Sequence, residues 1–245
     1  MYAWGARMND VKSYLRSLER SRESLTRADR PEVFVLAGRE WDLLDGVFAP
    51  SFSSTTEAAM GILGLTGADG LDLVPSESFL EVGSGTGVIA VAVALAGCAR
   101  VVATDISVAA VRNTELNAAR HGVADRVRVV RSDLFSGLGK EDLFDSVYWH
   151  SNFVLAPEDY DYHDEHERAY VDPGYAAHER YLIEAPLRVT EGGRALLQFS
   201  SRGDLDRLHE LARRHGRDLT VLAKHAFRDG EADLEHILLE IRVMG

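Results

Sequence analysis

78-SFLEVGSGTG-87 is the most informative stretch of this sequence. Residues 78–82 have the length and apolar composition of a short buried β-strand, and they run directly into a loop with glycine at every second position. Gly83, Gly85 and Gly87 let the backbone turn sharply and approach a ligand, because they carry no Cβ. The following VIAVAVALAG is apolar almost all round, as a buried helix is. A strand, a glycine loop and a helix in this order predict a ligand-binding turn of an α/β sheet.

Strands and helices alternate outward from this stretch, which predicts a parallel sheet covered on both faces. The last two strands are joined by a short turn at 228–230 and must be antiparallel. The expected fold class is therefore α/β, a doubly wound, mostly parallel seven-stranded sheet with an antiparallel last strand. Further strands are predicted at 100–105, 126–133, 143–149, 192–200, 219–227 and 234–243, and helices at 107–122, 173–189 and 203–216.

Residues 1–48 are predicted to form an extension, and 49–245 the main domain with a lid-like insertion at 155–175. In the extension, residues 8–28 have apolar side chains at helical spacing among charges, which predicts one amphipathic helix docked on the main domain or on a partner. The next segment alternates β-branched and aromatic residues around turn residues such as Gly38, which predicts a short β-hairpin. The helix could equally pack on a second subunit, so a homodimer is possible.

The bulk composition narrows the ligand class and the location. The chain has 245 residues, 46% of them hydrophobic, with 27 Lys and Arg against 39 Asp and Glu. A net charge of −12 disfavours nucleic acid as a partner, because duplex binding draws affinity from a basic face. No apolar run reaches the ~20 residues that a bilayer span needs, and the N-terminus lacks a secretory apolar segment. A cytoplasmic protein without a membrane partner is expected. The single Cys98 excludes an internal disulfide.

Acidic residues at successive strand ends indicate a nucleoside ligand. Asp105 ends the second strand about 20 residues after the glycine loop, where a carboxylate can accept hydrogen bonds from both ribose hydroxyls. Asp133 ends the third strand and can reach an adenine amine, while Glu81 precedes the loop. A nicotinamide cofactor is disfavoured, because its loop needs glycine where this chain has Val88.

The motif E81-V-G-S-G-T-G87, followed by Asp105 and S132-D-L-F135, resembles the class I S-adenosylmethionine-dependent methyltransferases across roughly residues 50–245. The chain resembles more narrowly the release-factor glutamine methyltransferase group, through GREW at 38–41 and VFAPSFSSTTEAAM before the first strand. That group's many-helix N-terminal substrate domain is replaced here by about one helix. The resemblance implies a Rossmann-like fold and S-adenosylmethionine as cofactor.

The resemblance also implies which residues hold the cofactor. Glu81 and the loop glycines would face its methionine part, Asp105 its ribose and Asp133 its adenine. Thr55, in the segment 53–56, would close over it, or would serve only at the start of a helix. The full set of expected cofactor contacts is Glu81, Gly83, Ser84, Gly85, Thr86, Gly87, Asp105, Ile106, Asp133, Leu134 and Thr55.

The expected catalytic residues follow the fourth strand. In the resembled group Asn-Pro-Pro-Tyr stands there and holds the substrate nitrogen; aligned through LFDSV, this chain has His150, Ser151, Asn152 and Phe153. With an unperturbed pKa near 6.5, His150 could act as a general base, or it could be an anchor for substrate or backbone. Asn152 could supply an amide oxygen or donor, and Phe153 a wall of the pocket.

The segment 155–175 combines acidic residues with tyrosines and histidines, which suits a cationic or amine-bearing substrate through ion pairs and cation–π contacts. Candidate substrate contacts, alongside a purely solvated loop, are Tyr160, Tyr162, His163, His166 and Tyr175. The spacing of its two histidines is too loose to predict a metal.

Together these features predict an enzyme that transfers a methyl group from S-adenosylmethionine to oxygen or nitrogen of a small molecule, as in a tailoring step of specialised metabolism. One alternative is a protein or peptide glutamine or amine N-methyltransferase. Another is a cofactor-binding regulatory protein without catalysis, favoured by the altered Asn-Pro-Pro-Tyr motif.

Overall fold

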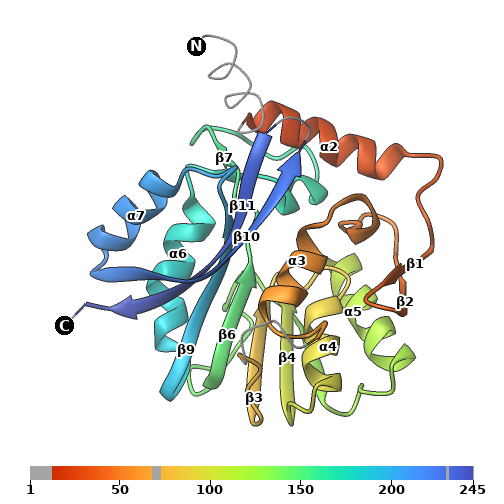
Figure 1. The fold of residues 1–245 in the computed structure, drawn as a ribbon, viewed down its shortest axis with the longest axis horizontal. Coiled ribbons are helices and arrows are strands. Elements are labelled where there is room, and N and C mark those ends of the chain that lie inside the picture. Colours follow the sequence, from red (N-terminus) through yellow and green to blue (C-terminus); the bar gives the residue numbers. More distant parts are fainter. Residues whose placement is uncertain (1–12, 68–72, 230–231, 245) are drawn as a thin grey trace.

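The computed structural model describes residues 13–67, 73–229 and 232–244, and within them a seven-stranded sheet forms the centre of the molecule (Figure 1). The strand order is β10-β11-β9-β6-β3-β4-β5, and β11 alone runs antiparallel to its neighbours. This confirms the predicted doubly wound sheet with its antiparallel last strand. The strands are β3 (Ser78–Val82), β4 (Arg100–Asp105), β5 (Val127–Arg131), β6 (Phe144–His150), β9 (Val189–Ser200), β10 (Arg217–Asp229) and β11 (Ala232–Val243).

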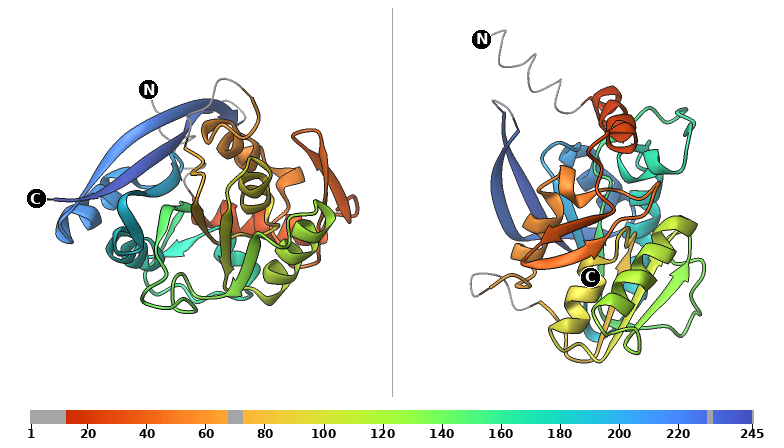
Figure 2. Two further views of the ribbon diagram at one scale, coloured as in Figure 1. Left: turned by 90° about the horizontal axis from the view of Figure 1, so that it is seen from below. Right: turned by 90° about the vertical axis from the view of Figure 1, so that its right-hand side faces the viewer.

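Helices cover both faces of this sheet and enclose two apolar cores (Figures 1 and 2). One core lies between the sheet and helices α3 and α4, where Met60 and Ile89 meet Leu238. The other lies between the sheet and helices α6 and α7, where Tyr181 and Leu208 meet sheet residues. The helices are α3 (Thr55–Ile62), α4 (Val88–Leu95), α5 (Val108–Arg120), α6 (Ala176–Glu184) and α7 (Leu205–Arg214).

The predicted hairpin precedes the sheet as β1 (Val33–Leu36) and β2 (Arg39–Asp42). Its turn residues Ala37 and Gly38 both have positive φ, 51° and 71°, as the tight hairpin turn requires. Two buried asparagines of α5, Asn113 and Asn117, accept hydrogen bonds from backbone N–H groups at and just after the end of β2, each at 2.8 Å. These bonds join the hairpin to the main sheet layer.

The predicted N-terminal helix is present as α2 (Tyr14–Thr26), and residues 8–12 of the predicted span lie outside the described residues. The helix packs on the chain's own insertion, where Leu18 joins an apolar cluster with Val154 and Val171. Its buried face otherwise consists of serines, while Leu15 is 57% exposed. The helix is therefore held partly by polar contacts, which apolar periodicity could not predict.

The insertion at 155–175 is more structured than a solvated loop. Strands β7 (Leu155–Ala156) and β8 (Asp172–Pro173) pair in parallel, with the 3₁₀ helix η2 (His166–Ala169) between them. In Figures 1 and 2 this insertion lies beside α2 at one end of the sheet. The two remaining 3₁₀ helices in the described part of the chain are η1 (Pro50–Phe52) and η3 (Ala185–Leu187).

None of the helices among the described residues combines the length and the apolar composition that a bilayer crossing requires. The stretch considered for a secretory signal, residues 1–10, lies outside the described residues. The division into an extension of residues 1–48 and a main domain stays a prediction.

Candidate functional site

A cavity of about 580 Å³ lies at the carboxyl ends of β3, β4 and β6. Its volume falls within the range of small-molecule and cofactor sites. The glycine loop forms part of its wall, and α2, the segment 46–56 and the insertion at 155–175 supply other parts. The cavity therefore stands where ligands bind in doubly wound sheets.

The three glycines of the loop all have positive φ, 68° at Gly83, 54° at Gly85 and 78° at Gly87. A Cβ at Gly85 would meet no atom within 4 Å, so the backbone there is open to a ligand. A Cβ at Gly87 would lie 2.7–2.9 Å from three atoms of Thr114. Gly83 and Gly85 line the cavity, whereas Gly87 packs against α5.

Gly87→Ala is expected to lower the free energy of unfolding by about 2–4 kcal/mol, through left-handed backbone strain and overpacking against Thr114. Gly122→Ala is the matched control, because Gly122 has a φ of 68° and a Cβ added there would meet no atom within 4 Å. In the control, the free energy of unfolding should fall only by the cost of left-handed backbone strain, about 1–2 kcal/mol. Urea unfolding of both variants measures the difference, and equal losses would contradict the packing argument.

Glu81 lies on β3 at the inner wall of the cavity and is 2% exposed. Its Oε2 accepts a hydrogen bond of 2.8 Å from Ala90 N–H, in the first turn of α4. Burial raises the pKa of this carboxyl well above its ordinary value. Glu81 thus holds the helix start in place and still faces the cavity.

Asp105 ends β4 and anchors the glycine loop. Its Oδ2 accepts from Gly85 N–H and its Oδ1 from Ser107 N–H, each at 2.9 Å. Burial raises the pKa of Asp105, and these backbone donors oppose that rise. Each carboxylate oxygen retains a second lone pair for a ligand hydroxyl. Asp105 and Ile106 both line the cavity.

Asp133 and Leu134 also line the cavity, but Asp133 stands at its rim. The Asp133 side chain is 52% exposed, and its Oδ2 accepts a hydrogen bond of 2.8 Å from Arg180. Leu134 is buried and holds a left-handed φ of 51°. The Asp133 carboxylate is therefore already paired, unlike a carboxylate reserved for a ligand.

His150 ends β6 and lines the cavity. Burial lowers the pKa of His150 to about 4. The imidazole is consequently neutral at neutral pH, and it is a much weaker base than an unperturbed histidine. The expected role of His150 as a general base or anchor stays a prediction, and a neutral imidazole keeps one ring nitrogen as an acceptor.

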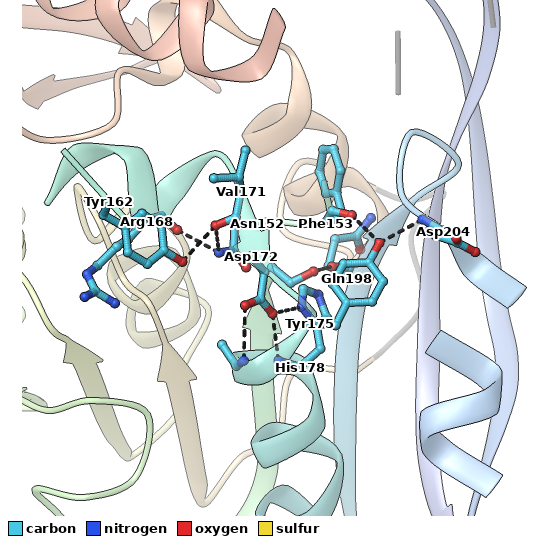
Figure 3. A network of polar contacts seen from close by, with 12 residues as sticks. Asn152, Phe153, Tyr162, Arg168, Val171, Asp172, Tyr175, His178, Gln198 and Asp204 are labelled. Atoms are coloured by element: carbon cyan, nitrogen blue, oxygen red, sulfur yellow. Dashed lines mark hydrogen bonds and ion pairs between the residues drawn. The ribbon is translucent and has the colours of Figure 1, made fainter. Parts of the chain in front are cut away.

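Asn152 lines the cavity and also fixes the insertion (Figure 3). Its Nδ2 donates to the carbonyl oxygens of Arg168 and Val171, each at 2.8 Å. Because carbonyl oxygens only accept, the orientation of this side-chain amide is unambiguous. Its Oδ1 is buried and has no hydrogen-bond partner among the described residues. Asn152 therefore keeps an unused acceptor oxygen on a residue that lines the cavity.

Phe153 lines the cavity, and the Tyr175 side chain binds its backbone (Figure 3). The Tyr175 hydroxyl donates to Phe153 O at 2.6 Å and accepts from Asp204 N–H at 2.7 Å. Nearby, the buried Asp172 carboxylate contacts His178 Nδ1 at 2.6 Å. These contacts tie the end of β6 to α6 and α7.

Among the candidate substrate residues, Tyr162 and His166 line the cavity, whereas Tyr160, His163 and Tyr175 do not. His166 is buried and contacts Ser21 of α2 at 2.7 Å, so it joins the insertion to the N-terminal helix. Within the residues that the structure describes, no three metal-ligating side chains come together. Thr55 is buried and lines the cavity beside the glycine loop.

Several cavity residues come from distant segments that no sequence motif connects with the site. Arg27 follows α2, Arg202 follows β9, and Phe227 lies on β10. Two arginines stack on aromatic rings there, Arg168 at 4.3 Å from the Tyr162 ring and Arg202 at 5.5 Å from the Phe227 ring. Arg202 could have been predicted as a cavity residue from the sequence, because it closely follows a predicted parallel strand and ligands bind at the carboxyl ends of such strands.

Acidification should destabilise the fold through its buried histidines. Burial lowers the pKa of His236 to about 3 and of His166 to about 4. Below pH ~6.5 the unfolded chain takes up protons that the folded chain refuses, so stability falls as the pH drops towards 4. Each such group contributes up to about 1.4 kcal/mol per pH unit. Urea unfolding at several pH values should show a shallower fall for His236→Phe; identical slopes would contradict the assignment.

The residues around the cavity fit S-adenosylmethionine. The loop leaves open space at Gly85, Asp105 offers two acceptor oxygens for ribose hydroxyls, and Glu81 supplies a carboxyl at the inner wall. A nucleoside with a cationic sulfonium suits this set of acidic and backbone groups.

The sequence has relatives among methyltransferases. The family model described as "Ribosomal protein L11 methyltransferase (PrmA)" matches residues 54–148. A release factor glutamine methyltransferase of Chlorobaculum tepidum is 46% identical over 70 residues, 28% of this chain and 24% of the relative. A ribosomal protein L11 methyltransferase of Pelotomaculum thermopropionicum is 46% identical over 70 residues, 28% of this chain and 23% of the relative. This chain thus spans about a quarter of the length of these relatives.

The fold is similar to that of a solved methyltransferase structure. The crystal structure of a ribosomal protein L11 methylase from Lactobacillus delbrueckii subsp. bulgaricus matches with a TM-score of 0.54 and 20% identity, covering 81% of this chain and 82% of the other. This likeness confirms the Rossmann-like fold.

The expected partner needs correction. The sequence alone favours a small-molecule substrate and disfavours nucleic acid, but the relatives are named for macromolecular substrates, release factor and ribosomal protein L11. The physical reason is that the net charge describes the whole chain and not the lining of the cavity, where five arginines stand beside five acidic residues. Specialised-metabolism tailoring likewise has no support.

In sequence over residues 54–148 and in fold over most of its length, the chain therefore resembles the class I S-adenosylmethionine-dependent methyltransferases, and among them the release factor glutamine and ribosomal protein L11 groups.

Proposed function

We propose that this protein is an S-adenosylmethionine-dependent methyltransferase that acts on a side-chain amide nitrogen of a protein or peptide. The names of its relatives support a protein substrate. The observation that carries the choice of atom is the Asn152 side chain, whose orientation is fixed by two backbone carbonyls and whose buried Oδ1 has no partner among the described residues.

The cofactor would lie along the glycine loop. Asp105 would accept hydrogen bonds from its ribose, and Glu81 would face its methionine part; Asp133 would approach its adenine from the rim. When bound, the cofactor supplies a methyl group on a sulfonium, which is electrophilic enough for direct displacement. The protein must then hold the acceptor nitrogen in line with that methyl group.

Asn152 would place that nitrogen. Its Oδ1 accepts an N–H of the substrate amide, and because Nδ2 is bound to the insertion, the side chain cannot turn away. Holding a reactant in near-attack geometry can supply several kcal/mol of the barrier reduction. Phe153 forms an apolar wall beside it, which keeps water from the acceptor.

The low basicity of His150 favours an amide over an amine. An ammonium must lose a proton before its nitrogen can attack, and a base with a pKa of about 4 cannot remove that proton efficiently at neutral pH. An amide nitrogen carries no such proton beforehand, and after methylation it becomes far more acidic than an imidazolium. His150 is basic enough to accept a proton at that stage.

Peptide arrays that differ only in one central residue test this proposal. Incubation with S-adenosylmethionine should add one methyl group to Gln or Asn peptides but not to matched Lys peptides, as located by tandem mass spectrometry. Methylation of Lys alone would overturn the amide assignment. If S-adenosylhomocysteine binds while neither peptide nor protein is methylated, the regulatory alternative without catalysis would take its place.

A further inference from the structure

Next to His150, one face of the sheet carries buried polar side chains without hydrogen-bond partners. Gln198 and His236 are both 0% exposed. Neither amide atom of Gln198 and neither ring nitrogen of His236 has a partner among the residues that the structure describes. Native proteins rarely leave buried polar groups unpaired, because each costs about 1–3 kcal/mol.

The strand register brings these side chains together. His150 on β6 pairs with Gln198 on β9, and directly paired residues point to the same face of a sheet. His236 on β11 pairs with Ser200, two positions beyond Gln198 and hence on that same face. Neighbouring strands lie about 4.8 Å apart, which puts the Gln198 amide within reach of the His150 ring after a side-chain rotation. Gln198 thus stands between two histidines.

His236 is shielded from the cavity by an aromatic ring. Phe227, which lines the cavity, stacks on His236 with ring centroids 4.2 Å apart and an interplanar angle of 10°. The Arg202 guanidinium also lies over the Phe227 ring, 5.5 Å from its centroid. Neither Gln198 nor His236 lines the cavity itself, so any role in the reaction acts through His150.

We propose that Gln198 is a positioning residue that sets which ring nitrogen of His150 faces the cavity as an acceptor. A neutral imidazole has one N–H and one acceptor nitrogen. These bonds are absent in the side-chain orientations described; after rotation of its amide, Gln198 would accept the N–H of His150 with its oxygen and donate from its NH₂ to a nitrogen of His236. The cavity-facing nitrogen of His150 is then unprotonated and can take the proton that the methylated amide releases. This assignment rests on the proposed amide methyltransferase function.

Gln198→Leu separates a positioning role from a structural one. Leucine is similar in volume and removes an unpaired buried amide, so the melting temperature should stay equal or rise. The turnover number should fall by about 100-fold, the cost of a small misplacement of a reacting group, while the KM for the peptide and the affinity for S-adenosylhomocysteine change little. Nitrogen-15 NMR of the imidazoles should show one His150 tautomer in the wild type and a mixture in the variant, with His150→Asn used to assign the signal.

Ser146→Ala is the matched control. Ser146 lies on β6 as well, is 3% exposed and has a buried hydroxyl without a partner among the described residues. It stands four residues before His150 and does not line the cavity. This variant should keep both its stability and its turnover. A single unchanged His150 tautomer in Gln198→Leu, or a clear loss of stability there, overturns the positioning role. If the wild type methylates no amide, the proposed function fails, while the tautomer measurement still decides the role of Gln198.

Discussion

Asn152→Ala is expected to lower kcat/KM for the peptide substrate by about a thousandfold, equivalent to roughly 4 kcal/mol. The variant loses the free acceptor oxygen and also the Nδ2 donor to the carbonyls of Arg168 and Val171, of which Val171 O keeps its hydrogen bond from the Tyr162 hydroxyl. Holding a reactant in near-attack geometry can supply several kcal/mol of the barrier reduction, so loss of the positioning oxygen accounts for the magnitude. Steady-state kinetics with the peptide, together with calorimetric titration of S-adenosylhomocysteine, measure the effect. Cofactor affinity should change only a few-fold.

Tyr162→Phe separates anchoring of the insertion from contact with the acceptor. The Tyr162 hydroxyl also donates to Val171 O, at 3.1 Å, so its removal weakens the same anchor without removing an acceptor oxygen. We expect a loss of less than about tenfold from one such hydrogen bond. If Tyr162→Phe were as inactive as Asn152→Ala, anchoring alone would explain the result and the contact between Asn152 and the substrate would be wrong.

Asp105→Ala is expected to weaken the binding of S-adenosylhomocysteine by at least about 100-fold. Two charge-assisted hydrogen bonds to ribose are lost, each worth about 1.5–3 kcal/mol. The loop also loses its anchor, because Asp105 accepts the N–H groups of Gly85 and Ser107. Isothermal calorimetry on the purified protein measures the affinity without any knowledge of the methyl acceptor.

Asp133→Ala serves as the control for this loss. Its carboxylate is half exposed and already paired with Arg180, so its removal should reduce the affinity by less than about tenfold. Equal losses in the two variants would mean that the cofactor lies differently along the strand ends than proposed.

Local patterns are enough to predict the architecture and the cofactor loop. Residues 78–87 form a strand, a turn and the start of a helix in direct succession, so their sequence alone contains the left-handed glycines and the acids around them. Alternating strands and helices predict the parallel order, and the short turn after β10 predicts the antiparallel last strand.

The chemistry after β6 could not be predicted in the same way. A histidine at a strand end looks like a base in sequence, but burial lowers the pKa of His150, and burial depends on how the whole chain packs. The partners of Asn152 lie 16 and 19 residues away in an insertion whose conformation the sequence does not indicate. The free acceptor of Asn152 is visible only once those partners are known.

S-adenosylmethionine with a tritiated methyl group distinguishes a protein acceptor from a small-molecule acceptor, because the label follows the transferred methyl group. The protein is incubated with this cofactor and a desalted cell extract to which the small-molecule fraction is added back, and acid-precipitable protein is then separated from soluble metabolites. Label is expected in protein, on side-chain amides, and it should disappear with Asn152→Ala. Label confined to the soluble fraction would contradict it, and would restore a small molecule as the methyl acceptor.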